Sequence, residues 1–249
     1  MRRVLVTGLS GLIGGALRKH VDGKYALRAL NRRPVAGVPT HQADLGDLAG
    51  IQPAFADVDT VVHLAAAAGD HHAPDVIMRS NVVGTLHVFE ASRLAGARRV
   101  IFASTGAVVS GWEREAPLSH LVAGRYDDAG KWAMLTHETP LRPAGLYGAS
   151  KVWGEALARH YSDAHDMSVL CVRIGRVKDE DRPTSARDRS VWCSQRDVVR
   201  MIEACIEAPD RLRFDVFYAT SNNRYGYRDL EHARAVLGWS PLDSADTFR

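Results

Sequence analysis

An apolar run near the start of the chain ends in a glycine-rich turn, and this feature restricts the fold more than any other. The segment reads Val4-Leu5-Val6-Thr7-Gly8-Leu9-Ser10-Gly11-Leu12-Ile13-Gly14. A buried strand that runs through such glycines into a helix is typical of the βαβ unit that binds a dinucleotide. The diphosphate approaches free N–H groups at the helix start, where a Cβ at Gly8 or Gly11 would obstruct it, and Gly14 lets the helix pack on the strand. The turn therefore predicts cofactor contacts from Gly8, Ser10, Gly11, Leu12, Ile13 and Gly14, although glycines that serve only a tight turn remain the alternative.

Short β-branched and apolar runs alternate with segments of helical periodicity along most of the chain. This order predicts an α/β fold: a Rossmann-type doubly wound parallel sheet with a small C-terminal substrate lobe. The expected strands span residues 3–7, 25–30, 41–43, 60–64, 99–103, 168–174 and 214–219. The expected helices span 12–21, 74–94, 147–165 and 195–207, with a short helix ending at Gly238.

The division of the chain follows from the same order. We predict a single domain over residues 1–249, in which 1–174 form mainly the dinucleotide-binding core. Residues 175–249 are expected to form the substrate lobe together with some remaining core elements. Residues 110–143 contain proline, glycine and scattered charges without a clear period. We expect a long, partly structured loop there, at the end of a strand where sites form.

Composition and charge exclude several classes of protein. The 249 residues carry 32 basic and 29 acidic side chains, without a dense basic cluster, which favours a small-molecule substrate over nucleic acid. Three cysteines without C-x-x-C spacing predict neither a disulfide framework nor a metal site, and fit a reducing, cytoplasmic location. No uncharged apolar run reaches the about 18 residues that span a bilayer, so no membrane partner is expected. The Arg2-Arg3 start imitates a secretory signal, but the glycine turn explains the apolar stretch better.

The end of the second expected strand bears on the choice of dinucleotide. An NAD site usually has an acidic residue there, which bonds the ribose 2′-hydroxyl. This chain has Asn31, Arg32 and Arg33 instead. Because an arginine pairs with a 2′-phosphate and a carboxylate repels it, we expect Asn31 and Arg32 to contact the cofactor and favour NADP over NAD. A solvated basic loop is the alternative.

A tyrosine and a lysine four residues apart begin a predicted helix. In Tyr147-Gly148-Ala149-Ser150-Lys151 this spacing puts the phenol and the ammonium on one helix face. The tyrosine acts as a base near neutral pH only if its pKa falls from about 10 to about 7, which costs about 4 kcal/mol. One nearby ammonium supplies about 3 kcal/mol, so a hydroxyl from Ser104 or Thr105 and a positively charged nicotinamide have to add to it. A chance spacing on a solvated helix is the alternative.

Together these motifs resemble the extended short-chain dehydrogenase/reductases, also called the NAD-dependent epimerase/dehydratase family. The resemblance covers nearly the whole chain. Members of that family pair through helices that match 74–94 and 147–165, so the resemblance implies a homodimer. Besides the glycine turn and the Tyr147 motif, it rests on Ala43-Asp44-Leu45, His63-Leu64-Ala65-Ala66, Ser80-Asn81-Val82-Val83-Gly84-Thr85, Ser104-Thr105 and Glu138-Thr139-Pro140-Leu141-Arg142-Pro143.

The resemblance implies a role for each matching residue. Thr105 would orient the substrate oxygen, and Tyr147 would be the acid/base. Lys151 would hold the nicotinamide ribose and lower the pKa of the tyrosine. These three would form the catalytic group, and Tyr147 and Lys151 would also contact the cofactor. Further cofactor contacts are implied for Asp44 and Leu45 beside the adenine, for Leu64, Ala65 and Ala66 beside the ribose and diphosphate, and for Asn81 near the nicotinamide.

The C-terminal half is similar to the uronate dehydrogenases, which oxidise the anomeric carbon of a free hexuronic acid to a lactone. This likeness rests on residues 145–151, 172–175, 190–194 and 237–241. It implies that Arg187 binds the substrate carboxylate through two parallel hydrogen bonds. Ser104, Thr105 and Arg176 are the other expected substrate contacts. The chain departs from the pattern because Gly106-Ala107 and Arg176 stand where small polar or sugar-binding residues are expected, which leaves the substrate open.

We therefore predict an NAD(P)-dependent oxidoreductase that transfers a hydride between a nicotinamide cofactor and a small hydroxylated substrate, with a sugar acid as the favoured substrate. A nucleotide-sugar epimerase or 4-ketoreductase uses the same catalytic group. However, only about 75 residues follow the sixth strand, a small lobe for enclosing both a nucleotide and a sugar. A non-catalytic dinucleotide-sensing protein is a further alternative, although it has no need for Thr105, Tyr147 and Lys151 together.

Overall fold

A seven-stranded parallel sheet forms the centre of the computed structural model, which describes residues 1–248. The strand order is β3-β2-β1-β4-β5-β6-β7, so the order reverses between β1 and β4. A ligand crevice lies at such a reversal in open α/β sheets, outside the carboxyl ends of the strands. The strands are β1 (Arg3–Thr7), β2 (Ala26–Asn31), β3 (Thr40–Gln42), β4 (Thr60–His63), β5 (Arg99–Thr105), β6 (Ser168–Ile174) and β7 (Phe214–Ala219).

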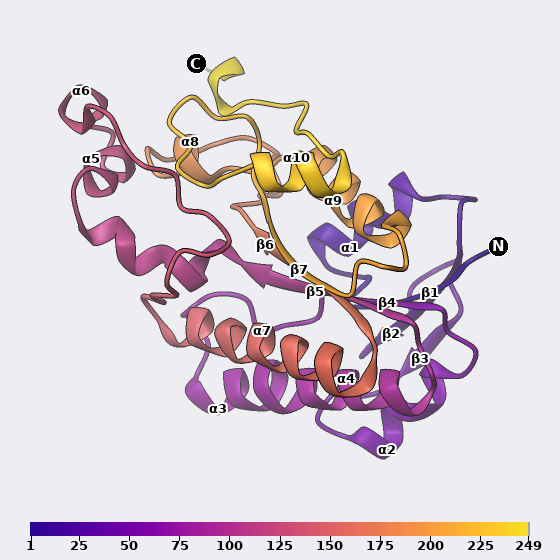
Figure 1. Ribbon diagram of the computed structural model, residues 1–249. Coiled ribbons are helices and arrows are strands. Elements are labelled where there is room, and N and C mark those ends of the chain that lie inside the picture. The colour runs from indigo at the N-terminus through magenta and orange to yellow at the C-terminus, as the bar shows by residue number, and fades with distance from the viewer. Residues whose placement is uncertain (249) are drawn as a thin grey trace.

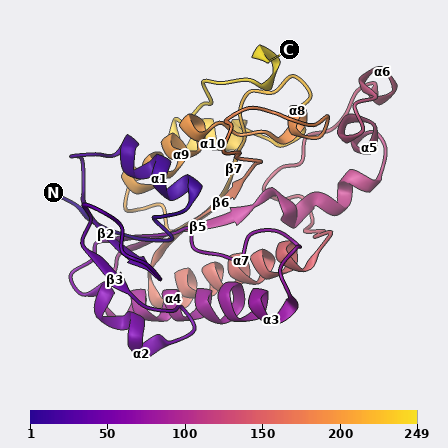
Figure 2. The ribbon, with the colours of Figure 1, turned by 180° about the vertical axis from the view of Figure 1, so that it is seen from behind.

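Helices cover both faces of the sheet (Figures 1 and 2). On one face lie α1 (Leu12–His20), α9 (Gln195–Glu207) and α10 (Glu231–Leu237). On the other lie α2 (Leu48–Ile51), the 3₁₀ turn η1 (Gln52–Phe55), a long helix over residues 74–94, and α7 (Leu146–His165). The predicted fold class is confirmed, with the sheet enclosed between the two helical layers.

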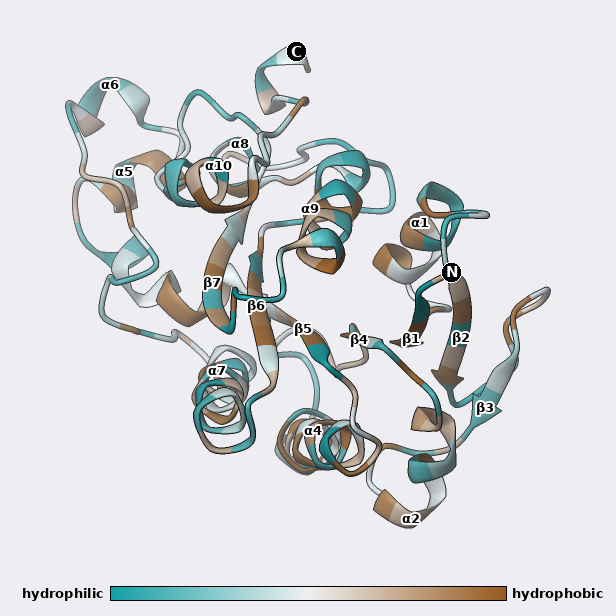
Figure 3. Cartoon of the chain, turned by 45° about the vertical axis from the view of Figure 1, so that its right-hand side comes forward, coloured by the Kyte–Doolittle hydropathy of each residue, from teal (hydrophilic) through white to brown (hydrophobic). Residues whose placement is uncertain are grey.

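Alternating side chains of the strands fill two cores. Val4 and Val6 pack in the layer with α1 and α9, whereas Leu5 packs in the layer with α7 and with α4 (Gly84–Leu94), the C-terminal part of the long helix. This alternation follows from the two-residue period of a strand, and burial on both faces explains why the strands read as continuous apolar runs. Figure 3 shows the hydrophobic residues on the strands and on the side of α9 that faces the sheet.

Two predicted segments have more structure than the sequence pattern indicated. The helix expected at 74–94 consists of α3 (Pro74–Ile77), a π-helical segment η2 (Met78–Val83) and α4 (Gly84–Leu94). Within the loop expected at 110–143, a 3₁₀ helix η3 (Gly106–Arg114) continues from β5 and is followed by α5 (Leu118–Val122) and α6 (Tyr126–Ala129). Single turns of helix carry too few residues for a period to be read from the sequence.

A third apolar cluster joins η3 and α5 to the C-terminal segments. It contains Val109, Leu121, Tyr218 and Tyr227, and α8 (Asp188–Val191) contributes Val191. The chain ends with the 3₁₀ turn η4 (Ala245–Thr247). The lobe beside the carboxyl ends of β5 to β7 is therefore built from residues on both sides of α7. Within residues 1–248 no helix has the length and apolar character to cross a membrane.

Candidate active site

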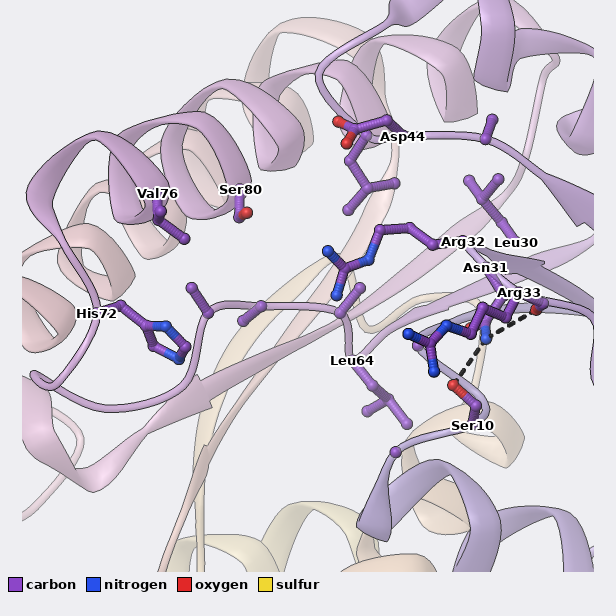
Figure 4. A pocket seen from close by; sticks show the side chains of 17 residues that line it. Ser10, Leu30, Asn31, Arg32, Arg33, Asp44, Leu64, His72, Val76 and Ser80 are labelled. Atoms are coloured by element: carbon purple, nitrogen blue, oxygen red, sulfur yellow. Dashed lines mark hydrogen bonds between the residues drawn. The ribbon is translucent and has the colours of Figure 1, made fainter.

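A cleft of about 850 Å³ opens where the strand order reverses (Figure 4). Its volume is in the range of pockets that bind cofactors and small molecules. The glycine turn, the end of β2, the segments after β3 and β4, and α3 with η2 form its walls. They contribute Gly8, Ser10, Gly11, Leu30, Asn31, Arg32, Arg33, Ala43, Asp44, Leu45, Leu64, Ala65, Ala66, Ala67, His72, Val76 and Ser80.

The glycine turn leaves no room for side chains at two positions. Gly8 has φ +73°, and a Cβ there would lie 2.8 Å from the amide nitrogen of Ala65. A Cβ at Gly14 would lie 2.6 Å from the carbonyl oxygen of Gly8. These two glycines thus let the turn pack tightly against Ala65 and the start of α1. Gly8, Ser10 and Gly11 line the cleft just before α1, and a glycine turn at a helix start fits the diphosphate of a dinucleotide.

A buried hydrogen-bond chain fixes the segment after β4 against the glycine turn. Nδ1 of His63 lies 2.7 Å from the hydroxyl oxygen of Thr7, and Nε2 lies 3.1 Å from that of Thr85 on α4. The Thr7 hydroxyl oxygen also accepts a 3.1 Å hydrogen bond from the amide of Ala65. Burial, followed by the charge of Lys151, lowers the pKa of His63 to about 3, so its imidazole is neutral. The chain holds Ala65 beside Gly8 at the bottom of the cleft.

Asn31 and two arginines form the wall at the end of β2. The Asn31 amide donates to the hydroxyl oxygen of Ser10 at 2.7 Å and is almost buried. Arg32 and Arg33 are exposed. In Figure 4 the Arg32 side chain extends across the cleft, whereas Arg33 lies closer to Ser10 and Asn31. Opposite them, Asp44 is paired with Arg79 at 3.4 Å.

Thr105, Tyr147 and Lys151 lie together beyond the inner end of this cleft. Thr105 ends β5, and a hydrogen bond between its side chain and Tyr147 favours the phenolate. Burial outweighs this bond, and with the charge of Asp70 it raises the pKa of Tyr147 above its ordinary value. The buried Lys151 ammonium donates to the carbonyl oxygen of Ala103 at 2.8 Å. Burial lowers the pKa of Lys151 to about 8.

The first turn of α7 is held in place from two sides. Oδ1 of Asp70 accepts a 2.8 Å hydrogen bond from the amide of Tyr147. Asn81 is buried in η2 and bonds both backbone groups of Ala67 as well as the Ser150 hydroxyl, at 2.8 to 3.1 Å. Asn81, an expected nicotinamide contact, thus lies behind the cleft wall and joins the segment after β4 to α7.

Ser104 points to the opposite side of β5 from Thr105. Its hydroxyl donates a 2.5 Å hydrogen bond to Glu155, which also pairs with Arg173 at 2.8 Å. All three side chains are buried. The structure therefore places Ser104, an expected substrate contact, in a buried network beneath α7, because neighbouring strand residues face opposite sides.

The two arginines expected to bind substrate differ in their surroundings. Nε and Nη2 of Arg187 donate to the carboxylate of Glu113 at 2.6 and 2.8 Å. Arg176 is exposed, and its guanidinium has no hydrogen-bond or ion-pair partner within residues 1–248. Arg187 is thus already engaged by a carboxylate of η3, which the sequence did not indicate.

Comparison with known proteins identifies the family. Residues 4–192 match the NAD dependent epimerase/dehydratase family. The chain belongs to this family. It is 34% identical to uronate dehydrogenase from Agrobacterium fabrum over 100% of this chain and 88% of that protein. It is 32% identical to NAD-dependent glucose-6-phosphate dehydrogenase from Haloferax volcanii over 98% of this chain and 95% of that protein.

A solved structure agrees with these sequence relatives. The crystal structure of uronate dehydrogenase from Agrobacterium tumefaciens is similar to the chain with a TM-score of 0.84 at 32% identity. The match covers 100% of this chain and 87% of the crystallised chain. The predicted likeness to uronate dehydrogenases is confirmed. As a member of the epimerase/dehydratase family, the protein is an oxidoreductase that uses a nicotinamide dinucleotide.

The cleft gathers many of the cofactor contacts that the glycine turn, the end of the second strand and the family resemblance predict. Those that line it are Gly8, Ser10, Gly11, Asn31, Arg32, Asp44, Leu45, Leu64, Ala65 and Ala66. Those outside its wall are Leu12, Ile13, Gly14, Asn81, Tyr147 and Lys151. Of the lining residues that were not predicted, Ala67 directly follows a matched motif, whereas Ala43 and Ser80 each begin one. Leu30 and Arg33 lie at the end of the second expected strand, and His72 carried no such signal. Val76 had no signal beyond its place on an expected helix.

Proposed function

We propose that the protein oxidises the anomeric hydroxyl of a free anionic sugar, a sugar acid or a sugar phosphate, with a nicotinamide dinucleotide as acceptor. The observation that carries the proposal is that Thr105 at the end of β5 lies close enough to Tyr147 to lower the pKa of its phenol, with Lys151 one turn further along α7. The similar uronate and glucose-6-phosphate dehydrogenases are named for anionic sugars. Their likeness over the full chain supports this substrate class.

In this proposal Thr105 and Tyr147 bind the hydroxyl group that reacts. Tyr147 Oη removes the hydroxyl proton, the oxygen forms a double bond to C1, and a lactone results. When bound, the nicotinamide accepts the hydride that leaves C1. Because burial raises the pKa of Tyr147, the phenol keeps its proton at neutral pH in this structure. Forming the base depends on hydrogen bonding from Thr105 and on positive charge, to which Lys151 contributes from the same helix face.

We assign the cofactor contacts to the cleft. The N–H groups at the start of α1 bind the diphosphate, and Asn31 and Arg32 lie where the adenine ribose would end. The absence of an acid at this strand end and the reach of Arg32 across the cleft favour NADP over NAD (Figure 4). We also propose a homodimer through α4 and α7. A reducing, cytoplasmic location is consistent with three buried free thiols.

Replacing Tyr147 by Phe tests the chemistry. The variant loses the group that transfers the proton, so kcat with the best sugar is expected to fall at least about 100-fold. Cofactor binding, followed by the fluorescence of the reduced dinucleotide, is expected to change little. The matched control is Tyr225→Phe, because the Tyr225 hydroxyl donates no hydrogen bond within residues 1–248.

The substrate screen uses uronates, sugar phosphates and neutral aldoses, each with NAD and NADP. Net formation of reduced cofactor supports a dehydrogenase, because an epimerase returns its hydride within each cycle. A Tyr147→Phe variant that turns over substrate like the wild type would contradict the proposed role of the tyrosine. The absence of net cofactor reduction with every sugar would contradict the dehydrogenase proposal.

A further inference from the structure

A buried guanidinium lies directly beside the proposed catalytic group. Arg228 is 3% exposed, and its guanidinium occupies the space that a Cβ on Gly106 would need. Gly106 follows Thr105, whose side chain bonds Tyr147. A positively charged planar group therefore lies against Gly106, the residue that directly follows Thr105. The Thr105 hydroxyl is the group proposed to contact the substrate oxygen.

The Arg228 side chain has unused hydrogen-bond donors. Its Nε is buried and donates to no group within residues 1–248. The nearest carboxylate oxygen belongs to Glu113, 3.9 Å from Nη2, which is beyond hydrogen-bond distance. A buried guanidinium without hydrogen-bond partners is costly, because the charge loses its water and gains nothing comparable. A bound anion would remove that cost.

Glu113 is engaged elsewhere. Its carboxylate accepts both hydrogen bonds of Arg187 and a 2.6 Å hydrogen bond from the Tyr227 hydroxyl. Although burial alone would raise it, the hydrogen bonds and charge of Arg187 hold the pKa of Glu113 below its ordinary value. The carboxylate is therefore ionised. Arg187 neutralises this carboxylate, so the charge of Arg228 is left without a hydrogen-bonded counter-ion.

The backbone keeps Arg228 in this position. Leu135, on the segment before α7, donates its amide to the carbonyl oxygen of Tyr227 at 2.7 Å. The carbonyl oxygen of Leu135 accepts the amide of Asp229 at 2.9 Å. The backbone is thus held on each side of Arg228, and the guanidinium packs against Gly106, which together restrict its movement before a ligand binds.

We infer that Arg228 is a specificity-determining residue that binds the oxyanion of the substrate, the role that the sequence assigned to Arg187. This inference rests on the proposed function, since it concerns the sugar that reacts beside Thr105 and Tyr147. Nε and one terminal nitrogen of a guanidinium can donate in parallel to a carboxylate or a phosphate. Arg187 instead neutralises Glu113 and so keeps that carboxylate from forming hydrogen bonds with Arg228.

The test compares Arg228→Gln, Arg228→Lys and the wild type with three sugars: glucuronate, glucose 6-phosphate and neutral glucose. Losing a charged hydrogen bond lowers kcat/KM for the anionic sugar about 10- to 100-fold. The value for glucose is expected to change less than about threefold, and the lysine variant to lie between the other two proteins. The anionic sugar whose kcat/KM falls further in Arg228→Gln identifies whether a carboxylate or a phosphate is the natural anion.

Two further variants separate recognition from a merely structural role. Gly106→Ala keeps the charge of Arg228 but displaces its guanidinium, so it is expected to reduce the preference for the anionic sugar. Its matched control is Gly15→Ala, where a Cβ would meet no atom within 4 Å. The control for the arginine variants is Arg182→Gln, because Arg182 is exposed. Thermal unfolding and dinucleotide binding verify that each variant folds.

Binding is measured separately from turnover. With dinucleotide present, the anionic sugar is expected to raise the unfolding temperature of the wild type but not of Arg228→Gln. If no sugar is oxidised, the proposed function fails, and this binding experiment still decides the role of Arg228. The inference is overturned if no anionic sugar binds, or if Arg228→Gln lowers kcat/KM equally for glucose and the anionic sugars. It is also overturned if Arg187→Gln removes the anion preference while Arg228→Gln keeps it.

Discussion

The end of β2 shows how single residues can set the choice of cofactor. Asn31 is held by Ser10 across the glycine turn, so its amide fixes the wall of the cleft. Arg32 and Arg33 remain exposed on that wall. A 2′-phosphate carries charge that a guanidinium binds with two hydrogen bonds, whereas a 2′-hydroxyl offers no such charge. In the proposed binding mode, the arginine nearest the ribose therefore decides the preference between NADP and NAD.

Arg32→Asp is expected to reverse this preference. The variant exchanges attraction for repulsion of the 2′-phosphate and adds an acceptor for a ribose hydroxyl, so the NADP to NAD ratio of kcat/KM falls about 10- to 100-fold or more. Steady-state kinetics with both cofactors measure the ratio. Arg33→Asp is the comparison, because it adds the same charge beside Ser10. An unchanged ratio in Arg32→Asp would show that Arg32 does not contact the ribose.

At the scale of elements, the ends of β1 and β4 depend on the neutral imidazole of His63. It lies between Thr7 and Thr85 and is fully buried. Its folded-state pKa of about 3 lies below the ordinary value of 6.5, so the unfolded chain binds the extra proton first. The free energy of unfolding therefore falls as pH decreases from about 6.5 towards about 3.

His63→Gln removes this dependence. Between pH 6.5 and pH 4, the free energy of unfolding of the wild type is expected to fall by about 1.4 kcal/mol per pH unit more than that of the variant. This is the slope that the uptake of one proton on unfolding produces. Urea unfolding at several pH values gives the slopes. The variant loses hydrogen bonds and starts less stable, so the slope is the quantity compared. His160→Gln, which changes an exposed histidine, should keep the wild-type slope. Parallel slopes for His63→Gln and the wild type would refute the argument.

The elements also show what a sequence can predict. The strands, the glycine turn and the start of α7 followed from local periodicity and spacing, because hydrogen bonds and burial within one unit determine them. The partner of a side chain depends on distant segments. Glu113 reaches Arg187 across 74 positions, and Arg228 meets Gly106 only after the lobe has folded. Ser104 and Thr105 are neighbours in the sequence, and only the pleat of β5 separates their surroundings.

At the scale of the whole molecule, one region forms the proposed cofactor cleft and another surrounds the proposed substrate residue Arg228. The glycine turn and β1 to β4 form the cleft wall, while η3, the segment around Leu135 and the residues after β7 together enclose the Arg228 cluster. The sequence predicted a lobe from residues 175–249 alone. The segment between β5 and α7 also forms part of this lobe. The sequence did not predict this, because the short helices of the segment show no clear period. The proposed specificity residue Arg228 thus lies where the two halves of the lobe meet.

The outer face of α4 and α7 determines the proposed assembly. The two helices lie side by side on one face of the sheet (Figure 1). Large apolar side chains remain exposed there, including Leu86 on α4 and Trp153 on α7, at 38% and 41%. Met78 and Val83 of η2, which directly precedes α4, are also exposed. Several exposed large apolar side chains on neighbouring helices favour association with a second copy.

Leu86→Glu is expected to weaken the dimer. A carboxylate buried in an apolar interface loses its hydration without gaining a partner, so the dimer dissociation constant rises at least about tenfold. Light scattering after size-exclusion chromatography, over a range of concentrations, measures it. The matched control is Leu242→Glu, which places the same charge at an exposed leucine near the C-terminus, away from α4 and α7. A wild type that is monomeric throughout this range would contradict the interface, as would equal dissociation of the two variants. Loss of the dimer by Leu86→Glu alone would assign the interface to the α4 surface, because both variants add one negative charge to the molecule.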